Sequence, residues 1–133
     1  MTGGKSVDKF EVITAGGPVN VPLSPALRAG DYIFVSGQVP VNPETGEIIG
    51  RTVEEQTEAV LRRIDTILQA AGCSLKDVVK TSVFMTDIKQ FDRMNATYRT
   101  FFPHHLPARS CIEIKLAIDV ALEIEAIAYA PRK

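Results

Sequence analysis

Apolar and polar residues alternate along several short stretches of this chain, which predicts a β-strand in each of them. Strands are expected at residues 10–14, 32–36, 78–86, 109–116 and 120–129. The stretch 15–30 contains three prolines and a Gly-Gly-Pro sequence, and we expect a structured loop there. The composition of residues 42–46 is typical of a turn that closes a hairpin.

Two other stretches place apolar residues three or four positions apart, as an amphipathic helix requires. The first starts with a capping box, Thr52 followed by Glu55, and ends at Gly72. The second starts at Asp87 and ends before Pro103, and its stripe of Met and aromatic residues is typical of a core-facing surface. The expected order is hairpin, helix, strand, helix, hairpin. Two right-handed crossovers would place both helices on one face of a mixed sheet, a two-layer α+β fold.

The other face of the predicted sheet is left without a covering layer. It is expected to combine aromatic and aliphatic side chains with charged ones, namely Tyr32, Phe34, Phe84, Ile127 and Tyr129 with Arg109, Glu123 and Glu125. An uncovered face with this much aromatic content suggests burial by another subunit.

Composition limits the class of protein. With 133 residues, 45% of them hydrophobic, the chain is long enough for one domain, which we expect to span residues 1–133. A net charge of −1 and the lack of a basic stripe argue against a nucleic-acid partner. The chain has no run of about 18 apolar residues and its first residues lack the apolar segment of a signal peptide, so we expect a cytoplasmic protein without membrane association. Its two cysteines, Cys73 and Cys111, predict neither a disulfide framework nor a metal site.

The strand at 109–116 carries the main candidate chemistry. Its alternation puts Ser110, Ile112 and Ile114 on one face, expected to point into the core, and Arg109 and Cys111 on the other. An arginine at a strand end is a good clamp for a carboxylate, because its planar donors match both oxygens of the anion. The alternative is an ordinary surface or salt-bridging arginine beside a small core-filling cysteine.

Several phrases of the sequence occur together and in a fixed order. They are SGQVPVNPETGE at 36–47, AAG at 70–72, VKT at 79–81, NATY at 95–98, FF at 101–102, PARSC at 107–111 and EIEAIA at 123–128. Together they resemble the reactive intermediate deaminase family (Rid, or YjgF-like), whose members are small enamine and imine hydrolases. The resemblance runs from about Pro22 to Tyr129. It implies a chorismate-mutase-like α+β fold in homotrimers, with a barrel-like centre and ligand sites in clefts between subunits.

The resemblance also implies roles for single residues. From the pattern alone, either Glu123 or Glu125 could stabilise an iminium and accept a proton from water. The family position with this role matches Glu123, which leaves Glu125 as an ion-pair partner, for example of Lys80 or Lys115. Arg109 would hold the substrate carboxylate.

Five further positions are expected to bind substrate, namely Ser36, Gly37, Asn95, Cys111 and Leu23. Ser36 and Gly37 match positions where the family backbone approaches the ligand, and Asn95 matches a polar position near the same cleft, although helix capping would explain Asn95 equally well. Cys111 matches a cysteine that lines the site. A nucleophilic Cys111 is not favoured, because no histidine base is near in sequence and an electrophilic iminium needs no covalent intermediate.

The adjacent histidines at 104 and 105 are not expected to bind a metal, because neighbouring side chains diverge and no third ligand is evident. We expect no cofactor. One position departs from the family: Leu23 stands where a tyrosine is usual. Leu23 makes the entrance more apolar, which implies either a deaminase with a preference for bulkier or less polar imino acids, or a relative that binds without turnover.

The sequence therefore predicts a cofactor-free deaminase that hydrolyses 2-enamino and 2-imino acids to 2-keto acids and ammonia, with Arg109 and Glu123 as catalytic residues. Two alternatives remain: a regulatory module that binds a small carboxylate, and an endoribonuclease or translation inhibitor, as reported for some relatives. The retained Glu123 argues against a pure binder of anions, and the lack of a basic surface argues against RNA.

Overall fold

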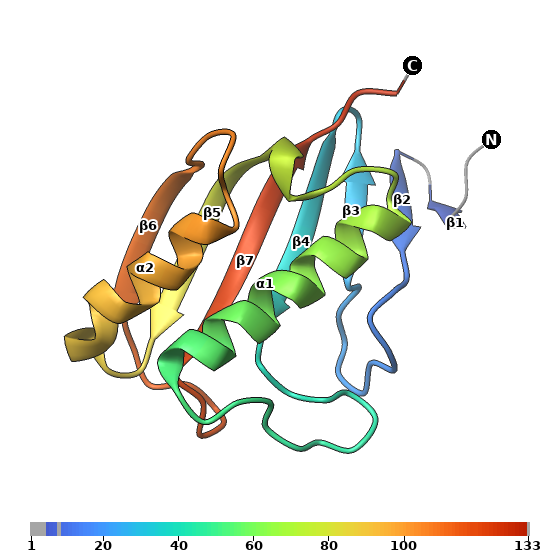
Figure 1. Ribbon diagram of the computed structural model, residues 1–133. Coiled ribbons are helices and arrows are strands. Elements are labelled where there is room, and N and C mark those ends of the chain that lie inside the picture. Colours follow the sequence, from blue (N-terminus) through green and yellow to red (C-terminus); the bar gives the residue numbers. More distant parts are fainter. Residues whose placement is uncertain (1–4, 8, 133) are drawn as a thin grey trace.

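The computed structural model describes residues 5–7 and 9–132 and forms one mixed sheet with two helices on the same face (Figure 1). The helices are α1 (Val53–Ala70) and α2 (Phe91–Thr100). The strands are β1 (Lys5–Val7), β2 (Phe10–Ile13), β3 (Ala26–Ala29), β4 (Tyr32–Gln38), β5 (Val78–Met85), β6 (Ala108–Glu113) and β7 (Leu122–Tyr129). Short 3₁₀ turns, η1 (Leu75–Asp77) and η2 (Ile88–Gln90), precede β5 and α2. The predicted two-layer α+β class is confirmed.

The strand order in the sheet is β1-β2-β3-β4-β7-β5-β6. Strands β5 and β6 run parallel, and the other neighbouring pairs run antiparallel. The expected final hairpin is therefore wrong, because β7 does not pair with β6 and inserts between β4 and β5 instead. Every second residue of β7 is buried, which suits a central strand, whereas β6 is mostly exposed and suits an edge.

The expected loop at 15–30 contains a strand, β3, that sequence reading missed. A two-residue turn at Gly30 and Asp31 connects it to β4, and Gly30 has the positive φ of +60° that such hairpin turns need. Only four residues long, with two alanines and a proline just before it, β3 has little strand propensity of its own. The predicted turn at 42–46 is present, but it closes a single bridge, Val41 with Ile48.

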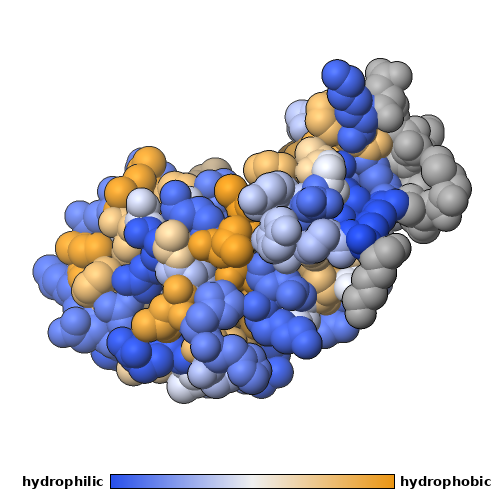
Figure 2. All heavy atoms as spheres, turned by 90° about the horizontal axis from the view of Figure 1, so that it is seen from above, coloured by the Kyte–Doolittle hydropathy of each residue, from blue (hydrophilic) through white to orange (hydrophobic). Residues whose placement is uncertain are grey.

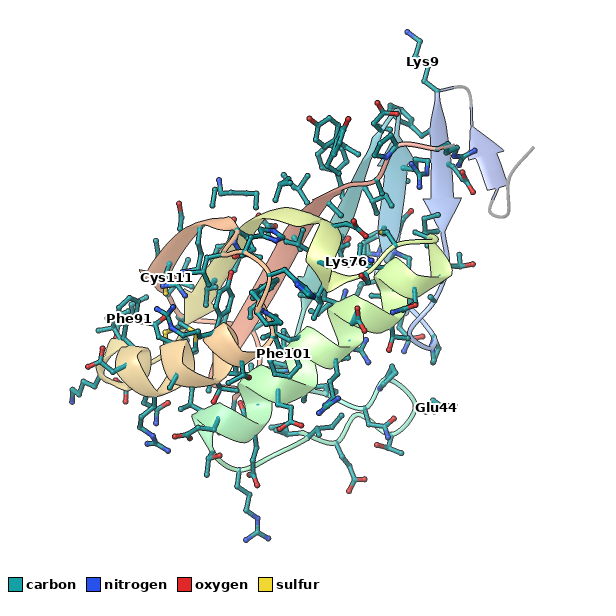
Figure 3. All side chains as sticks on the ribbon, turned by 45° about the horizontal axis from the view of Figure 1, so that its top comes forward. Lys9, Glu44, Lys76, Phe91, Phe101 and Cys111 are labelled. Atoms are coloured by element: carbon teal, nitrogen blue, oxygen red, sulfur yellow. The ribbon has the colours of Figure 1, made fainter. Side chains whose placement is uncertain are left out.

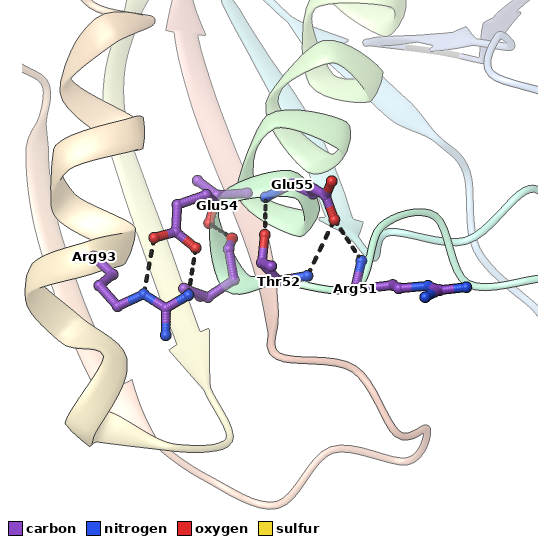
Figure 4. Close-up of polar contacts among 7 residues, drawn as sticks. Arg51, Thr52, Glu54, Glu55 and Arg93 are labelled. Atoms are coloured by element: carbon purple, nitrogen blue, oxygen red, sulfur yellow. Dashed lines mark hydrogen bonds and ion pairs between the residues drawn. The ribbon is translucent and has the colours of Figure 1, made fainter.

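Helix α1 begins as its capping box predicts (Figure 4). The Thr52 hydroxyl accepts a hydrogen bond from the Glu55 N–H at 3.1 Å, and the Glu55 carboxylate accepts one from the Thr52 N–H at 3.2 Å. Glu54 in the same turn forms a two-pronged ion pair with Arg93, with N–O distances of 2.7 and 2.8 Å. This pair joins α1 to α2 at the surface.

The core lies between the helices and the sheet. From α1 it takes an apolar stripe, and from the sheet it takes alternate residues of the central strands, including Ile33, Val83, Met85, Leu122 and Ile124. Helix α2 contributes Met94 and Tyr98, as its spacing predicts. No helix in the described part of the chain is both long and apolar enough to span a membrane.

Strand β6 has the reverse orientation from the one expected. Ile112 is 47% exposed and Ile114 is 46% exposed, so these residues do not enter the core of the protomer. Arg109 and Cys111 point toward α2 instead, and both are half-buried. Alternation alone identifies two faces but not which one is covered, and the long stem of an arginine can pack under a helix as an apolar residue does.

The uncovered face of the sheet carries large exposed aromatic side chains, as expected. Tyr32, Phe34 and Tyr129 are each 44–45% exposed, and the rings of Tyr32 and Tyr129 lie 5.3 Å apart.

Seen from above relative to Figure 1, the surface of the molecule is mostly hydrophilic with separate apolar patches (Figure 2).

Candidate active site

Arg109 is the second residue of β6 and lies under α2. Its Nη1 donates a hydrogen bond to the Asn95 Oδ1 at 2.8 Å. Its guanidinium carbon lies 4.9 Å from the centre of the Tyr98 ring and 5.6 Å from that of Phe91. All three partners come from one face of α2, because positions 91, 95 and 98 are spaced by about one helical turn. The arrangement fixes the plane of the guanidinium by stacking and one hydrogen bond.

Arg109 has no acidic partner within ion-pair distance among residues 5–7 and 9–132. The alternative of a salt-bridging arginine is therefore wrong for the described part of the chain. A half-buried guanidinium without a counter-ion favours an anion supplied from outside.

A cavity of about 270 Å³ opens beside this arginine. It is lined by Asn95, Tyr98, Arg99, Leu106, Pro107 and Arg109. Its lining residues thus include two arginines, one asparagine and several apolar or aromatic residues, and the cavity is large enough for a small organic acid.

Cys111 lies two residues beyond Arg109 on the same face of β6, at the edge of the sheet that α2 and its Phe91 cover (Figure 3). Burial raises the pKa of the Cys111 thiol, and the positive charge of Arg109 offsets this only in part. The thiol is therefore protonated at neutral pH, which agrees with the expectation that Cys111 is not a nucleophile.

The neighbouring histidine pair has a structural use. The Nε2 of His105 lies 2.6 Å from the Val78 carbonyl oxygen, which fixes the loop before β6 to the start of β5. Within the described ranges, no three His, Cys, Asp or Glu side chains gather as a metal site would require.

A second group of the expected site residues lies elsewhere. Glu123, near the start of β7, lies on the uncovered face of the sheet opposite Gly37 of β4. A Cβ at Gly37 would collide with the Glu123 carboxylate and would approach its Cδ to 2.8 Å. Burial raises the pKa of the Glu123 carboxyl, and the charge of Glu125 raises it further. Gly37 therefore makes room for a carboxylate that accepts protons more readily than an exposed glutamate.

Ser36 fixes the segment that carries Leu23. Its hydroxyl donates to the Ser24 carbonyl at 2.6 Å, and its N–H donates to the Pro25 carbonyl at 3.0 Å. Leu23 itself is 47% exposed and, with Gly37 and Arg63, lines a separate groove of about 240 Å³. Leu23 is thus not a wall of the Arg109 cavity of the same protomer.

Arg109 and Glu123 do not share a face of the sheet, so that expectation is wrong. Arg109 pairs with Thr81, which in turn pairs with Ala126, whereas Glu123 pairs with Phe84. Arg109, Thr81 and Ala126 therefore lie on one face of the sheet. Glu123 precedes Ala126 on β7 by an odd number of residues, and because side chains alternate along a strand, Glu123 points to the opposite face. The suggested ion pairs of Glu125 with Lys80 or Lys115 are not formed in the described part either.

The sequence reading missed the aromatic support of Arg109. Phe91 and Tyr98 were interpreted only as core residues, and Arg99 was not singled out. The sequence contained a sign of this support. Phe91 and Tyr98 lie four residues before and three residues after Asn95, so all three share one face of the helix, and Asn95 is the position that matches the family site.

Comparison with known proteins assigns the chain to a family. A family model described as Endoribonuclease L-PSP matches residues 17–130. A RutC family protein of Pyrococcus horikoshii is 43% identical over 123 residues, covering 91% of this chain and 98% of the relative. The 2-iminobutanoate/2-iminopropanoate deaminase of Escherichia coli is 43% identical over 122 residues, covering 88% and 94%.

Solved structures agree. The YjgF gene product of E. coli superposes with a TM-score of 0.82 at 40% identity, covering 90% of this chain and 98% of that one. E. coli TdcF with bound serine gives a TM-score of 0.83 at 38% identity and the same coverage. The chain therefore belongs to the RutC/YjgF/Rid family, the family of the Endoribonuclease L-PSP model.

Proposed function

We propose that this protein is a cofactor-free deaminase of reactive 2-enamino and 2-imino acids, of the 2-iminobutanoate/2-iminopropanoate deaminase type. The observation that carries the proposal is Arg109, a guanidinium held by Asn95 and two aromatic rings with no acidic partner in the described chain. The name of the E. coli relative and the serine bound to TdcF support a small substrate with a carboxylate.

The reaction is hydrolysis. Water adds to the carbon of the protonated C=N bond, a C–O bond forms, the C–N bond breaks, and ammonia and a 2-keto acid leave. Arg109 holds the substrate carboxylate with two parallel N–H donors and so fixes the reacting carbon beside it. Glu123 stabilises the iminium, orients the water, accepts its proton and returns that proton to the nitrogen, so that ammonia can leave as the C–N bond breaks. This role suits a carboxyl with a raised pKa.

Because Arg109 and Glu123 lie on opposite faces of one sheet, the proposed active site needs two protomers. One protomer supplies Arg109, Asn95 and Cys111, and its neighbour supplies Glu123 and the Gly37 segment with Leu23. The homotrimer that the family resemblance implies, with sites in clefts between subunits, would unite the two halves and bury the exposed aromatic face. A cytoplasmic location belongs to the same proposal.

A second candidate function rests on Leu23, which leaves a hydrocarbon where a hydroxyl is usual at the entrance. It is a regulatory protein that binds a small carboxylate without turnover. Glu123 favours the deaminase over the regulatory protein, because a negative charge beside the site would only weaken the binding of a carboxylate. A role as an endoribonuclease is disfavoured by the net charge of −1.

The test is to generate 2-iminopropanoate and 2-iminobutanoate with an amino-acid oxidase and to trap the remaining imine with semicarbazide. The wild-type protein should accelerate imine loss, and Arg109→Ala should reduce kcat/KM by about a hundredfold or more, since it removes a paired charged contact. Arg51→Ala, at an exposed arginine outside the site, is the matched control.

A Glu123→Gln variant separates the two candidate functions. Under the deaminase proposal it loses turnover and still binds 2-oxobutanoate in calorimetry. If wild type binds the keto acid but hydrolyses neither imine faster than buffer, the protein is the regulatory relative.

A further inference from the structure

A second arginine, which the proposed reaction does not use, lines the Arg109 cavity. Arg99 lies in the last turn of α2, one helical turn after Asn95, and lines the cavity with Arg109. Its guanidinium makes no hydrogen bond and no ion pair with any residue in the described part of the chain.

Another arginine on α2, Arg93, provides a comparison. Arg93 is an exposed arginine on the same helix, and both of its terminal contacts are taken by Glu54. Arg99 has no such partner, and the residues that line the cavity with it include no aspartate or glutamate. The residues that line this small cavity therefore carry two positive charges and no negative one, and the others are an asparagine, a tyrosine and two apolar residues.

The hydroxyl of Tyr98 is not free to bind a second polar group of the substrate. The Tyr98 hydroxyl is bonded to the Thr81 hydroxyl at 2.7 Å inside the core, so Tyr98 presents its ring to the cavity. Leu106 and Pro107 complete the apolar wall. Among the residues that line this cavity, Arg99 is the charged one besides Arg109.

We propose that Arg99 forms a subsite for a second anionic group, so that the preferred substrates are imines of acidic amino acids, the 2-imino dicarboxylates. This inference rests on the proposed function and names its substrate class. Arg109 takes the carboxylate next to the C=N bond, and Arg99 takes the carboxylate at the end of the side chain. Hydrolysis is unchanged: water adds, ammonia leaves, and a 2-keto dicarboxylate is released.

This preference is opposite in polarity to the one that Leu23 suggested. Leu23 lines a different groove of the protomer, whereas Arg99 lies in the same cavity as the carboxylate clamp. Within one protomer, the residues that line the Arg109 cavity come from α2, the loop before β6 and the start of β6, and they include Arg99. In the proposed two-protomer site, Leu23 would come from the neighbouring protomer, so its effect on preference adds to that of Arg99.

The experiment compares the imines of glutamate and norvaline, which have the same number of carbons and differ in the terminal carboxylate. The quantity measured is the ratio of their kcat/KM values in wild type, Arg99→Gln and Arg99→Glu. We expect the ratio to favour the glutamate imine in wild type, to fall about fivefold or more in Arg99→Gln, and to fall further in Arg99→Glu. Arg93→Gln is the matched control on the same helix and should leave the ratio as in wild type.

Binding gives a readout that does not depend on turnover. Calorimetry with 2-oxoglutarate and 2-oxopentanoate should show tighter binding of the dicarboxylate in wild type and loss of that difference in Arg99→Gln. An unchanged ratio and an unchanged binding difference in both Arg99 variants would overturn the subsite. If the imines are hydrolysed in an Arg109-dependent way at the same time, the proposed deaminase stands and only the substrate class falls.

Discussion

Asn95 orients Arg109, the residue that we propose binds the substrate carboxylate. The Asn95 Oδ1 takes one of the five N–H groups of Arg109 at 2.8 Å, and the remaining donors are left for a carboxylate. A neutral amide is suited to this position, because it orients the guanidinium without neutralising it.

Replacing Asn95 with aspartate should place a carboxylate beside Arg109 that competes with the substrate carboxylate for the guanidinium. The new carboxylate would form an ion pair with Arg109 and compete with the substrate carboxylate, so KM for 2-iminopropanoate should rise about tenfold or more. Asn95→Ala removes the support but adds no charge, and it should raise KM less. Initial rates over a range of substrate concentrations give both values. A KM for Asn95→Asp equal to that of wild type would contradict the assignment of Arg109 as the carboxylate clamp.

The raised pKa of Glu123 predicts a specific pH dependence. The unprotonated carboxylate is the form that accepts a proton, so kcat/KM should fall as the pH drops through a pKa above the ordinary value of 4.5. Burial is the larger cause of the rise and the charge of Glu125 is the smaller one. Glu125→Gln removes only the smaller cause.

The acid limb of the profile should therefore move to lower pH in Glu125→Gln while remaining above that of an ordinary glutamate. The measurement is kcat/KM from pH 4 to 8 for both proteins on the same imine, so that titration of the substrate affects both equally. A shift to higher pH, or none, would mean that another group sets the acid limb.

At the scale of elements, the sequence predicted α1 almost to the residue, because the capping box and the apolar spacing both act within one helix. It failed where the outcome depends on contacts between distant segments. The insertion of β7 between β4 and β5, and the side of β6 that α2 covers, are decided by burial of the whole sheet and not by alternation within a strand.

The same distinction holds for the candidate site. The resemblance placed Asn95 near Arg109 and Cys111, and the structure brings the side chains of Asn95 and Arg109 into contact, with Cys111 two residues further along β6. Glu123 was placed on the wrong face relative to Arg109, because that relation depends on the registers of two strand pairs. Contacts between elements that follow one another in sequence join Arg109 to Asn95. The pairing of strands that are distant in sequence decides where Glu123 lies relative to Arg109.

The contact between α2 and β5 allows a stability prediction. The hydroxyls of Thr81 and Tyr98 are hydrogen-bonded at 2.7 Å, and Thr81 is 1% exposed. Tyr98→Phe keeps the ring that stacks on Arg109 but leaves the Thr81 hydroxyl without its partner, which should cost about 1–3 kcal/mol of unfolding free energy. Urea denaturation at a fixed protein concentration measures it.

Combining Tyr98→Phe with Thr81→Val removes both polar groups at once. The double variant should lose less stability than the two single variants added together, and it could match Tyr98→Phe alone. Strict additivity would show that the two hydroxyls contribute independently and that their bond does not tie α2 to the sheet.

At the scale of the whole molecule, one protomer carries the proposed site residues in two separate groups. The Arg109 half lies under α2 at the β6 edge, and the Glu123 half lies on the uncovered face beside Gly37. The exposed Tyr32, Phe34 and Tyr129 on that second face give a neighbouring copy a large apolar surface to bury. A cyclic assembly would repeat one contact and so complete every site in the same way.

This arrangement predicts complementation between two inactive proteins. Arg109→Ala and Glu123→Gln should each be inactive alone, because every site in either assembly lacks one group. After subunit exchange in an equal mixture, a site receives Arg109 from one kind of protomer and Glu123 from the other in about a quarter of cases. The mixture should therefore recover roughly a quarter of wild-type activity on 2-iminopropanoate.

Differently tagged subunits, recovered together by sequential affinity steps, would verify that exchange took place, and sedimentation would show whether the assembly has three times the 14.5 kDa mass of the chain. The control is an Arg109→Ala protein exchanged with a second Arg109→Ala protein, which can restore no site. Exchanged assemblies that stay inactive would place Arg109 and Glu123 in separate sites. Because the two residues lie on opposite faces of one sheet, such a result would also remove Glu123 from the proposed mechanism and leave the water to a group not yet identified.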